Sequence, residues 1–255
     1  MRWQITSEMW ETLNATWIEL RGFGRRSMAS RRRGDAPRGD AALADSAGAE
    51  ATRFFDWVKD RSHLFRGVTY GTIVRGEAFN FSRLGTHLER ADNTARILDV
   101  KYFLLLPSPE EVGGVLDELQ WISLLRSAGA YQMFRQSRQQ AIQPKAVAAF
   151  LLLDPIFPRS VRYCLERIHE TLKIVKGESV PGAPDELECL SGLTLARWSY
   201  TSIDALIAGG LHESIDELQS DFNRLHELIE QRYFIAANIA ATNVASSAES
   251  PCVPA

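Results

Sequence analysis

The chain has 255 residues, of which 45% are hydrophobic and 24% charged, and its formal net charge at pH 7 is -3. A chain of this length buries roughly 75% of its unfolded surface on folding, so it can form one large domain or two small ones. Ala and Leu far outnumber Val and Ile, which favours helices and argues against a β-sandwich or a barrel. The weakly negative charge argues against a protein that works by coating nucleic acid.

Cysteine usage and hydropathy bear on the compartment. Cys164, Cys189 and Cys252 lie far apart in the sequence and form no CxxC pair, so neither a zinc site nor a disulfide framework is expected. The longest apolar runs, such as 146–153, are too short to span a bilayer, and the N-terminus lacks the apolar segment of a signal peptide. We therefore expect a cytoplasmic protein with no membrane partner.

The first predicted helix covers residues 2–21. Trp3, Trp10 and Trp17 recur every seven residues in it and so share one helix face. Because no capping residue precedes this pattern, we expect the chain to begin inside a helix whose tryptophan face is only partly covered. Exposed indoles on one face favour aggregation, so a homo-oligomer is the expected consequence.

A mobile loop is predicted at 25–45. Its stretch from Arg25 to Arg38 holds six arginines and one aspartate among Gly, Ser and Pro residues, which cannot bury apolar surface. A solvated loop is the first interpretation. Contact with an acidic partner or nucleic acid, and screening of the acidic last helix, are the alternatives. No aromatic residue is interleaved, which argues against nucleic-acid binding by base stacking.

Hydrophobic spacing and prolines predict the remaining helices. These cover 47–66, 81–105, 115–126 with a continuation over 128–140, 144–153, 158–175, 185–208 and 211–238. The 81–105 helix and the last helix keep heptad spacing over three or more turns, so they should have the most buried stripes. The predicted fold is an all-α bundle of about eight helices without a sheet. It forms a single domain over 1–243, followed by a disordered tail over 244–255.

Catalytic motifs are scarce. The sequence contains no GxSxG elbow, no P-loop, no GxGxxG fingerprint and no HExxH, so no cofactor is expected. One Glu-x-x-His pair occurs, at Glu166 and His169, whereas di-metal carboxylate bundles need two such pairs and two further glutamates. We expect a solvated or salt-bridged helix edge there, with a metal role as the minor alternative and no metal site assigned.

Polar residues cluster on one edge of the predicted 81–105 helix, beside its apolar stripe. Glu89, Asp92, Arg96 and Asp99 share an arc of roughly 80°, and Asn93 lies next to Glu89. Partly buried carboxylates need a partner, and Arg96 lies four residues after Asp92 and seven after Glu89. A salt-bridge network that fixes the helix register is the first interpretation. A site for an amine, an amino acid or a cation is the alternative.

Several stretches of the chain resemble one family. They are ITSEMWETLN (5–14), RSHLFRGVT (61–69), FSRLGTHLERADNTARILDVKY (81–102), LQWISLLRSAGAYQMFR (119–135) and FLLLDPIFPRSVRYCLERI (150–168). The chain is thereby similar to the bacterial alpha-E family, a helical domain of unknown function. That family has a repeated ER-x-x-N helix, carried here by Glu89, Arg90 and Asn93. Relatives have a further copy upstream, so the resemblance implies an N-terminally shortened chain.

The resemblance also implies a function. Members are typically encoded beside circularly permuted ATP-grasp ligases and transglutaminase-like proteins. A non-catalytic partner or substrate-presenting subunit of an ATP-grasp-type amide or peptide ligase is therefore expected. An enzyme of peptide or amide metabolism acting through Glu89, Asn93 and Arg96 is the alternative. The candidate binding residues are Glu89, Arg90, Asp92, Asn93, Arg96 and Asp99. A partner needs an extended exposed surface, whereas an enzyme needs a pocket that encloses Glu89 and Asn93.

Overall fold

The computed structural model describes residues 5–33, 40–101, 114–138, 141–176 and 185–235. These ranges contain ten α-helices and no strand, which confirms the all-α prediction. The count exceeds the predicted eight because two predicted helices are each divided. The chain forms two compact units, residues 1–79 and 80–255. In the described ranges, no helix is both long and apolar enough to cross a membrane.

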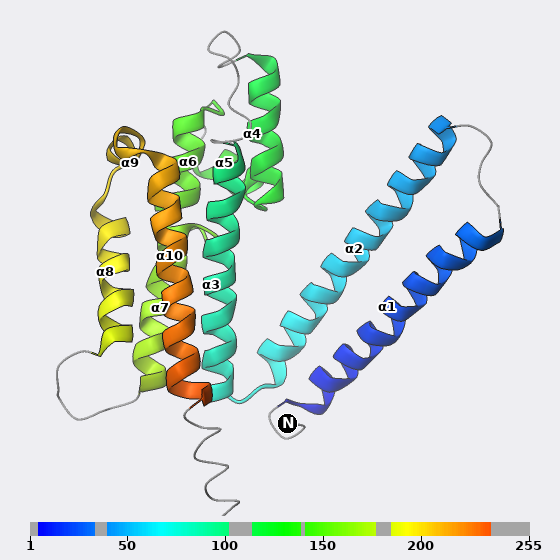
Figure 1. Ribbon diagram of the computed structural model, residues 1–255, viewed down its shortest axis with the longest axis horizontal. Coiled ribbons are helices and arrows are strands. Elements are labelled where there is room, and N and C mark those ends of the chain that lie inside the picture. The colour runs from blue at the N-terminus through cyan, green and yellow to red at the C-terminus, as the bar shows by residue number, and fades with distance from the viewer. Residues whose placement is uncertain (1–4, 34–39, 102–113, 139–140, 177–184, 236–255) are drawn as a thin grey trace, which may run out of the picture. The chain divides into compact units, whose positions relative to one another are not determined.

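The first unit is a hairpin of two long helices, α1 (Ser7–Arg33) and α2 (Asp40–Thr72), which run antiparallel (Figure 1). The hydroxyl of Thr6 accepts a hydrogen bond from the Met9 amide at 3.3 Å and so caps α1. It also bonds the Thr72 hydroxyl at 2.7 Å, which ties the start of α1 to the end of α2. The predicted helix over 2–21 is therefore wrong at residues 5 and 6. Its boundary was placed from the tryptophan spacing, which does not report the cap at Thr6.

The tryptophan face of α1 is partly covered, as predicted. Trp10 is 40% exposed and Trp17 is 57% exposed, whereas Trp3 lies outside the described residues. Glu19 accepts a hydrogen bond from the Trp57 indole at 2.7 Å and pairs with Arg61 of α2 at 2.8 Å. Polar contacts of Glu19 with two residues of α2 therefore join the helices of this hairpin.

The predicted loop over 25–45 is wrong for much of its length. Residues 25–33 continue α1, and residues 40–45 belong to α2. Arginine, alanine and methionine are good helix formers, so helix propensity alone can extend α1 through the arginine-rich segment. The breakers Gly34 and Pro37 lie outside the described residues.

The second unit contains the remaining helices. They are α3 (Glu77–Asp99), whose first turn crosses the unit boundary, α4 (Val115–Ser127), α5 (Tyr131–Arg138), α6 (Pro144–Leu153), α7 (Val161–Lys176), α8 (Glu186–Tyr200), α9 (Ile203–Gly209) and α10 (Leu211–Ile229) with a π-helical extension over Glu230–Ile235. Figure 1 shows α3, α7, α8 and α10 running alongside one another. Most heptad positions of α3 and α10 are buried, among them Ala95, Leu98, Ile215 and Leu218, so each of these helices has a buried stripe.

Three predicted boundaries in this unit need correction. Gly129, with φ of +62°, separates α4 from α5, so 128–140 does not simply continue the preceding helix. Ser202 caps α9 by accepting from the Ala205 amide at 3.2 Å, so the predicted 185–208 helix is two helices. The helix predicted over 158–175 is α7, which begins at Val161, and Pro158 lies in the turn before it. In each case a cap or turn residue interrupts apolar spacing that continues across the break.

Two further predictions fall on residues that the structure leaves undescribed. The predicted 81–105 helix is seen as α3 to Asp99 and continues as π-helical backbone to Lys101. Residues 102–113, including the expected stop at Pro107, lie outside the described ranges. The predicted tail over 244–255 lies outside them too.

Candidate functional site

Some residues of the polar edge of α3 are exposed without an ion pair, and others are paired with each other. Glu89 and Asn93 are exposed. One turn further along, Arg96 Nε donates to Asp92 Oδ2 at 2.8 Å, which is the ion pair that the spacing predicts. That hydrogen bond raises the pKa of the Arg96 guanidinium. The structural interpretation of the edge is thus confirmed for this pair, while Glu89 and Asn93 remain open to a ligand.

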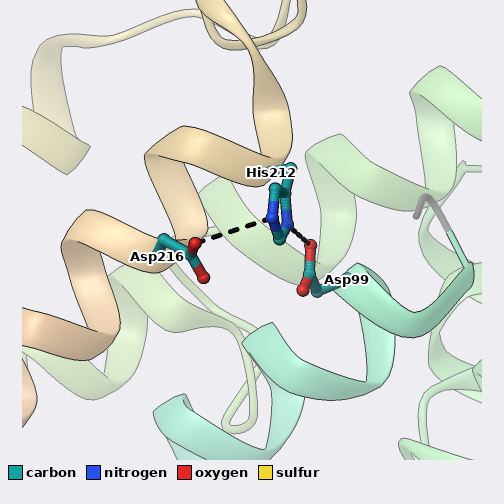
Figure 2. Close-up of side chains that lie close together, drawn as sticks. All are labelled: Asp99, His212 and Asp216. Carbon is teal, nitrogen blue, oxygen red and sulfur yellow. Dashed lines mark hydrogen bonds and ion pairs between the residues drawn. The ribbon is translucent and has the colours of Figure 1, made fainter. Parts of the chain in front are cut away.

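Asp99 ends α3 beside the start of α10 (Figure 2). Its Oδ1 lies 2.7 Å from His212 Nδ1, and His212 Nε2 lies 3.5 Å from Asp216 Oδ2. The hydrogen bond with Asp99, helped by the charges of Asp99 and Asp216, raises the pKa of His212 above its ordinary value. The imidazole is therefore flanked by a carboxylate on each side and favours its protonated form.

The helix dipoles disfavour the charges of both partners in the contact between Asp99 and His212. Asp99 is the last residue of α3, where the dipole is negative, and His212 is the second residue of α10, where it is positive. A negative carboxylate and a protonated imidazole are each disfavoured at those ends when taken alone. Pairing Asp99 with His212 offsets both costs, so the contact joins the end of one helix to the start of the other.

The same three side chains offer a set of potential metal ligands. One ligand atom each from Asp99, His212 and Asp216 lie within 4.8 Å of one another. Imidazole nitrogen with carboxylate oxygen suits a divalent transition metal such as Zn²⁺. The hydrogen bond of 2.7 Å already accounts for the placement of His212. We therefore assign the cluster as a charge-paired histidine.

Arg90 lies on another face of α3 from the polar edge. Its side chain is half-buried and makes no ion pair with any described residue. Its charge acts on two buried groups, the His87 imidazole and the Cys164 thiol. Burial raises the pKa of Cys164 to about 12, with Arg90 opposing the shift, so this thiol stays protonated at neutral pH.

The Glu-x-x-His pair on α7 does not form a ligand pair. Glu166 lies 3.6 Å from Arg162 and 3.9 Å from Arg167, whereas His169 bonds the Ser191 hydroxyl of α8 through Nδ1 at 2.9 Å. Burial, followed by the charge of Lys173, lowers the pKa of His169. The predicted salt-bridged helix edge is confirmed.

A family model matches residues 1–234, and it describes Alpha-E as a predicted alpha-helical domain with a conserved ER motif. The chain belongs to the Alpha-E family. In this Alpha-E chain the dipeptide ER occurs at 89–90 on α3 and at 166–167 on α7. No curated protein and no solved structure matches the chain.

The Alpha-E chain also has a groove between the end of α3 and α4, with a volume of about 420 Å³. Exposed Leu116 and Leu119 line it, together with Lys101. The Lys101 ammonium lies 2.8 Å from Asp117 Oδ1, and both side chains are only 3% exposed. Glu89 and Asn93 are not among the lining residues, so this groove is no pocket for the predicted site.

Two residues of these arrangements were missed at the level of sequence. His212 lies next to no recognisable motif, whereas His87 lies two residues before the Glu89–Arg90 dipeptide. His212 meets Asp99 across 113 positions of sequence, and such a contact has no short-range signal. His87 lies four residues before Ala91 and so on the same face of the helix, which is the sequence signal that could have predicted its burial.

Proposed function

We propose that this Alpha-E chain is a non-catalytic partner or substrate-presenting subunit of an ATP-grasp-type amide or peptide ligase system. The observation that supports this most directly is the exposure of Glu89 and Asn93 on one edge of α3. Small-molecule sites enclose most of their ligand, whereas protein partners need accessible side chains on a continuous surface. The ligase as partner comes from the family resemblance, in which such genes are neighbours.

The charge pairs of α3 support a presenting role. Asp92 is engaged by Arg96, and Asp99 by His212, so these carboxylates are neutralised within the chain. Glu89 makes no ion pair with a described residue, so its exposed carboxylate is accessible to an incoming group. An amine of a substrate or a basic side chain of the ligase fits such a carboxylate with Asn93 beside it.

The test is co-purification of the tagged full chain with the ATP-grasp ligase encoded beside it. Glu89→Gln and Asn93→Ala should each weaken the complex, and Arg96→Ala should have the same effect because it lies on the same helix edge. Glu118→Gln removes an exposed carboxylate of α4 and serves as the matched control. Absence of a complex, or equal complex formation by all four variants, contradicts the proposal.

The second candidate is an enzyme of peptide or amide metabolism, and one observation favours it. Asp99 holds His212 by its Nδ1, as a carboxylate orients the histidine of many acid-base sites. In this case the chain alone would turn over an amide substrate, and His212→Gln would abolish turnover without removing the folded protein. If product formation instead depends on the ligase and persists in His212→Gln, the enzyme candidate is excluded and the partner role is supported.

A further inference from the structure

One side of α1 in the α1–α2 hairpin is apolar and exposed. Its large side chains, Trp10, Leu13, Trp17 and Leu20, follow one another in steps of three and four residues, so they share this side of the helix. Each of these four residues is at least 39% exposed. The spacing is that of a coiled-coil seam, which buries such positions against another helix.

Helix α1 contacts α2 through a different side. Glu19 bonds two residues of α2. Thr12 and Thr16 are half-buried and lie on the same side of α1 as Glu19. Met9 is the buried apolar residue of that side. The side that α1 uses within the hairpin is therefore largely polar, and its apolar side lies roughly 100° further around the helix axis.

Helix α2 adds apolar residues on the same side of the hairpin. The Trp57 indole donates to Glu19 at 2.7 Å. Leu20 and Val58 are the next residues along the two helices. One residue turns each helix by about 100° in the same sense, so in this antiparallel pair (Figure 1) both side chains turn to the same side. Phe55 lies three residues before Val58 and is 66% exposed, so it extends the apolar surface.

This apolar surface is large enough for a stable interface. We call it the hairpin face and define it by six residues, Trp10, Leu13, Trp17, Leu20, Phe55 and Val58. With roughly half of each side chain exposed, the hairpin face presents on the order of 500 Å² of apolar surface. A stable interface buries roughly 800 Å² on each partner, of which somewhat more than half is apolar. The hairpin face therefore supplies the apolar area that one partner of a stable dimer needs.

We propose that the hairpin face binds the hairpin face of a second copy of the chain, so that two hairpins form a four-helix bundle. A hairpin of two helices encloses no core of its own. Two hairpins packed face to face place four apolar stripes around one core, as four-helix bundles do. A second copy also matches the length of the hairpin, whose helices have 27 and 33 residues.

The dimer gives the homo-oligomer expected from the tryptophan spacing a defined interface. It is independent of the proposed partner role, because Glu89 and Asn93 belong to the second unit.

The test is sedimentation equilibrium of the full chain over a range of concentrations, which gives the mass and the dissociation constant of the dimer. The wild-type chain should be dimeric. Leu13→Glu and Val58→Glu each place a carboxylate in the apolar interface, where it loses its hydration. Because a two-fold interface contains each substituted residue twice, each variant should raise the dissociation constant at least about a hundred-fold.

Ile18→Glu and Leu64→Glu are the matched controls, because both residues are exposed and apolar and lie on the same two helices outside the hairpin face. Neither should change the dissociation constant. Circular dichroism of each variant separates lost dimerisation from lost folding, and Leu13→Ser provides a milder change at the same position. A full chain that stays monomeric overturns the proposal and assigns the hairpin face to an occupant other than a second copy. A dimer that folded Leu13→Glu and Val58→Glu both retain also overturns it.

Discussion

Asp117→Ala should destabilise the second unit far more than the loss of a surface charge would. The carboxylate of Asp117 lies 2.8 Å from the Lys101 ammonium, and both side chains are 3% exposed. Removing one partner leaves a buried uncompensated charge, which costs about 3–5 kcal/mol. Folded domains are stable by only about 5–15 kcal/mol in total, so the loss is a large part of the stability.

The assay is urea unfolding of the full chain, with hydrogen exchange of α3 and α4 peptides as the local readout. Asp92→Ala removes the carboxylate of the more exposed Asp92–Arg96 pair on the same helix and should cost about 0–1 kcal/mol. The double variant Lys101→Met/Asp117→Leu removes both charges and should recover most of the loss. Equal destabilisation by Asp117→Ala and Asp92→Ala would refute the argument that burial sets the magnitude.

Three further predictions concern other positions. The hydrogen bond with Asp99 raises the pKa of His212 above 6.5, so the contribution of this pair to the stability of the fold should be complete below pH 6.5 and disappear as the pH rises through the raised pKa. In a plot of the urea unfolding midpoint against pH, Asp99→Asn should remove this decline. In a Cys252→Ser background, exposed Cys189 should react with a thiol reagent in the folded chain, while buried Cys164, whose pKa is raised to about 12, should react only after unfolding; equal rates would contradict its burial. Gly129→Ala should destabilise the fold by about 1–2 kcal/mol in thermal unfolding, because φ is +62° and an L-residue is strained in this left-handed conformation; an unchanged melting temperature would exclude strain there.

Properties with a local cause could be predicted from the sequence. The helical class follows from composition, and the buried stripe of α3, with Leu84, Ala91 and Leu98, follows from its spacing of three and four residues. The Asp92–Arg96 pair follows from the same geometry, because residues four apart share a helix face. Each of these depends only on positions within a few turns of one another.

Local rules were wrong where a competing local preference was stronger. The arginine-rich segment 25–33 is helical because helix propensity does not require buried apolar surface. The cap at Thr6 and the turn at Gly129 divide or shorten helices whose apolar spacing continues across them. Caps and left-handed turns depend on backbone conformation at one residue, which hydrophobic periodicity does not report.

The candidate sites depend on tertiary structure. Asp99 acquires its partner from α10, and the ring of His87 on α3 lies beside that of Tyr163 on α7. Lys101 is buried with Asp117 only because the end of α3 packs against α4. The periodicity of each helix predicts which of its faces is buried. Which helix packs against that face, and in which register, depends on how the side chains of the two helices fit together. Contacts between residues far apart in the chain therefore decide which polar groups meet, and no spacing within one helix contains that information.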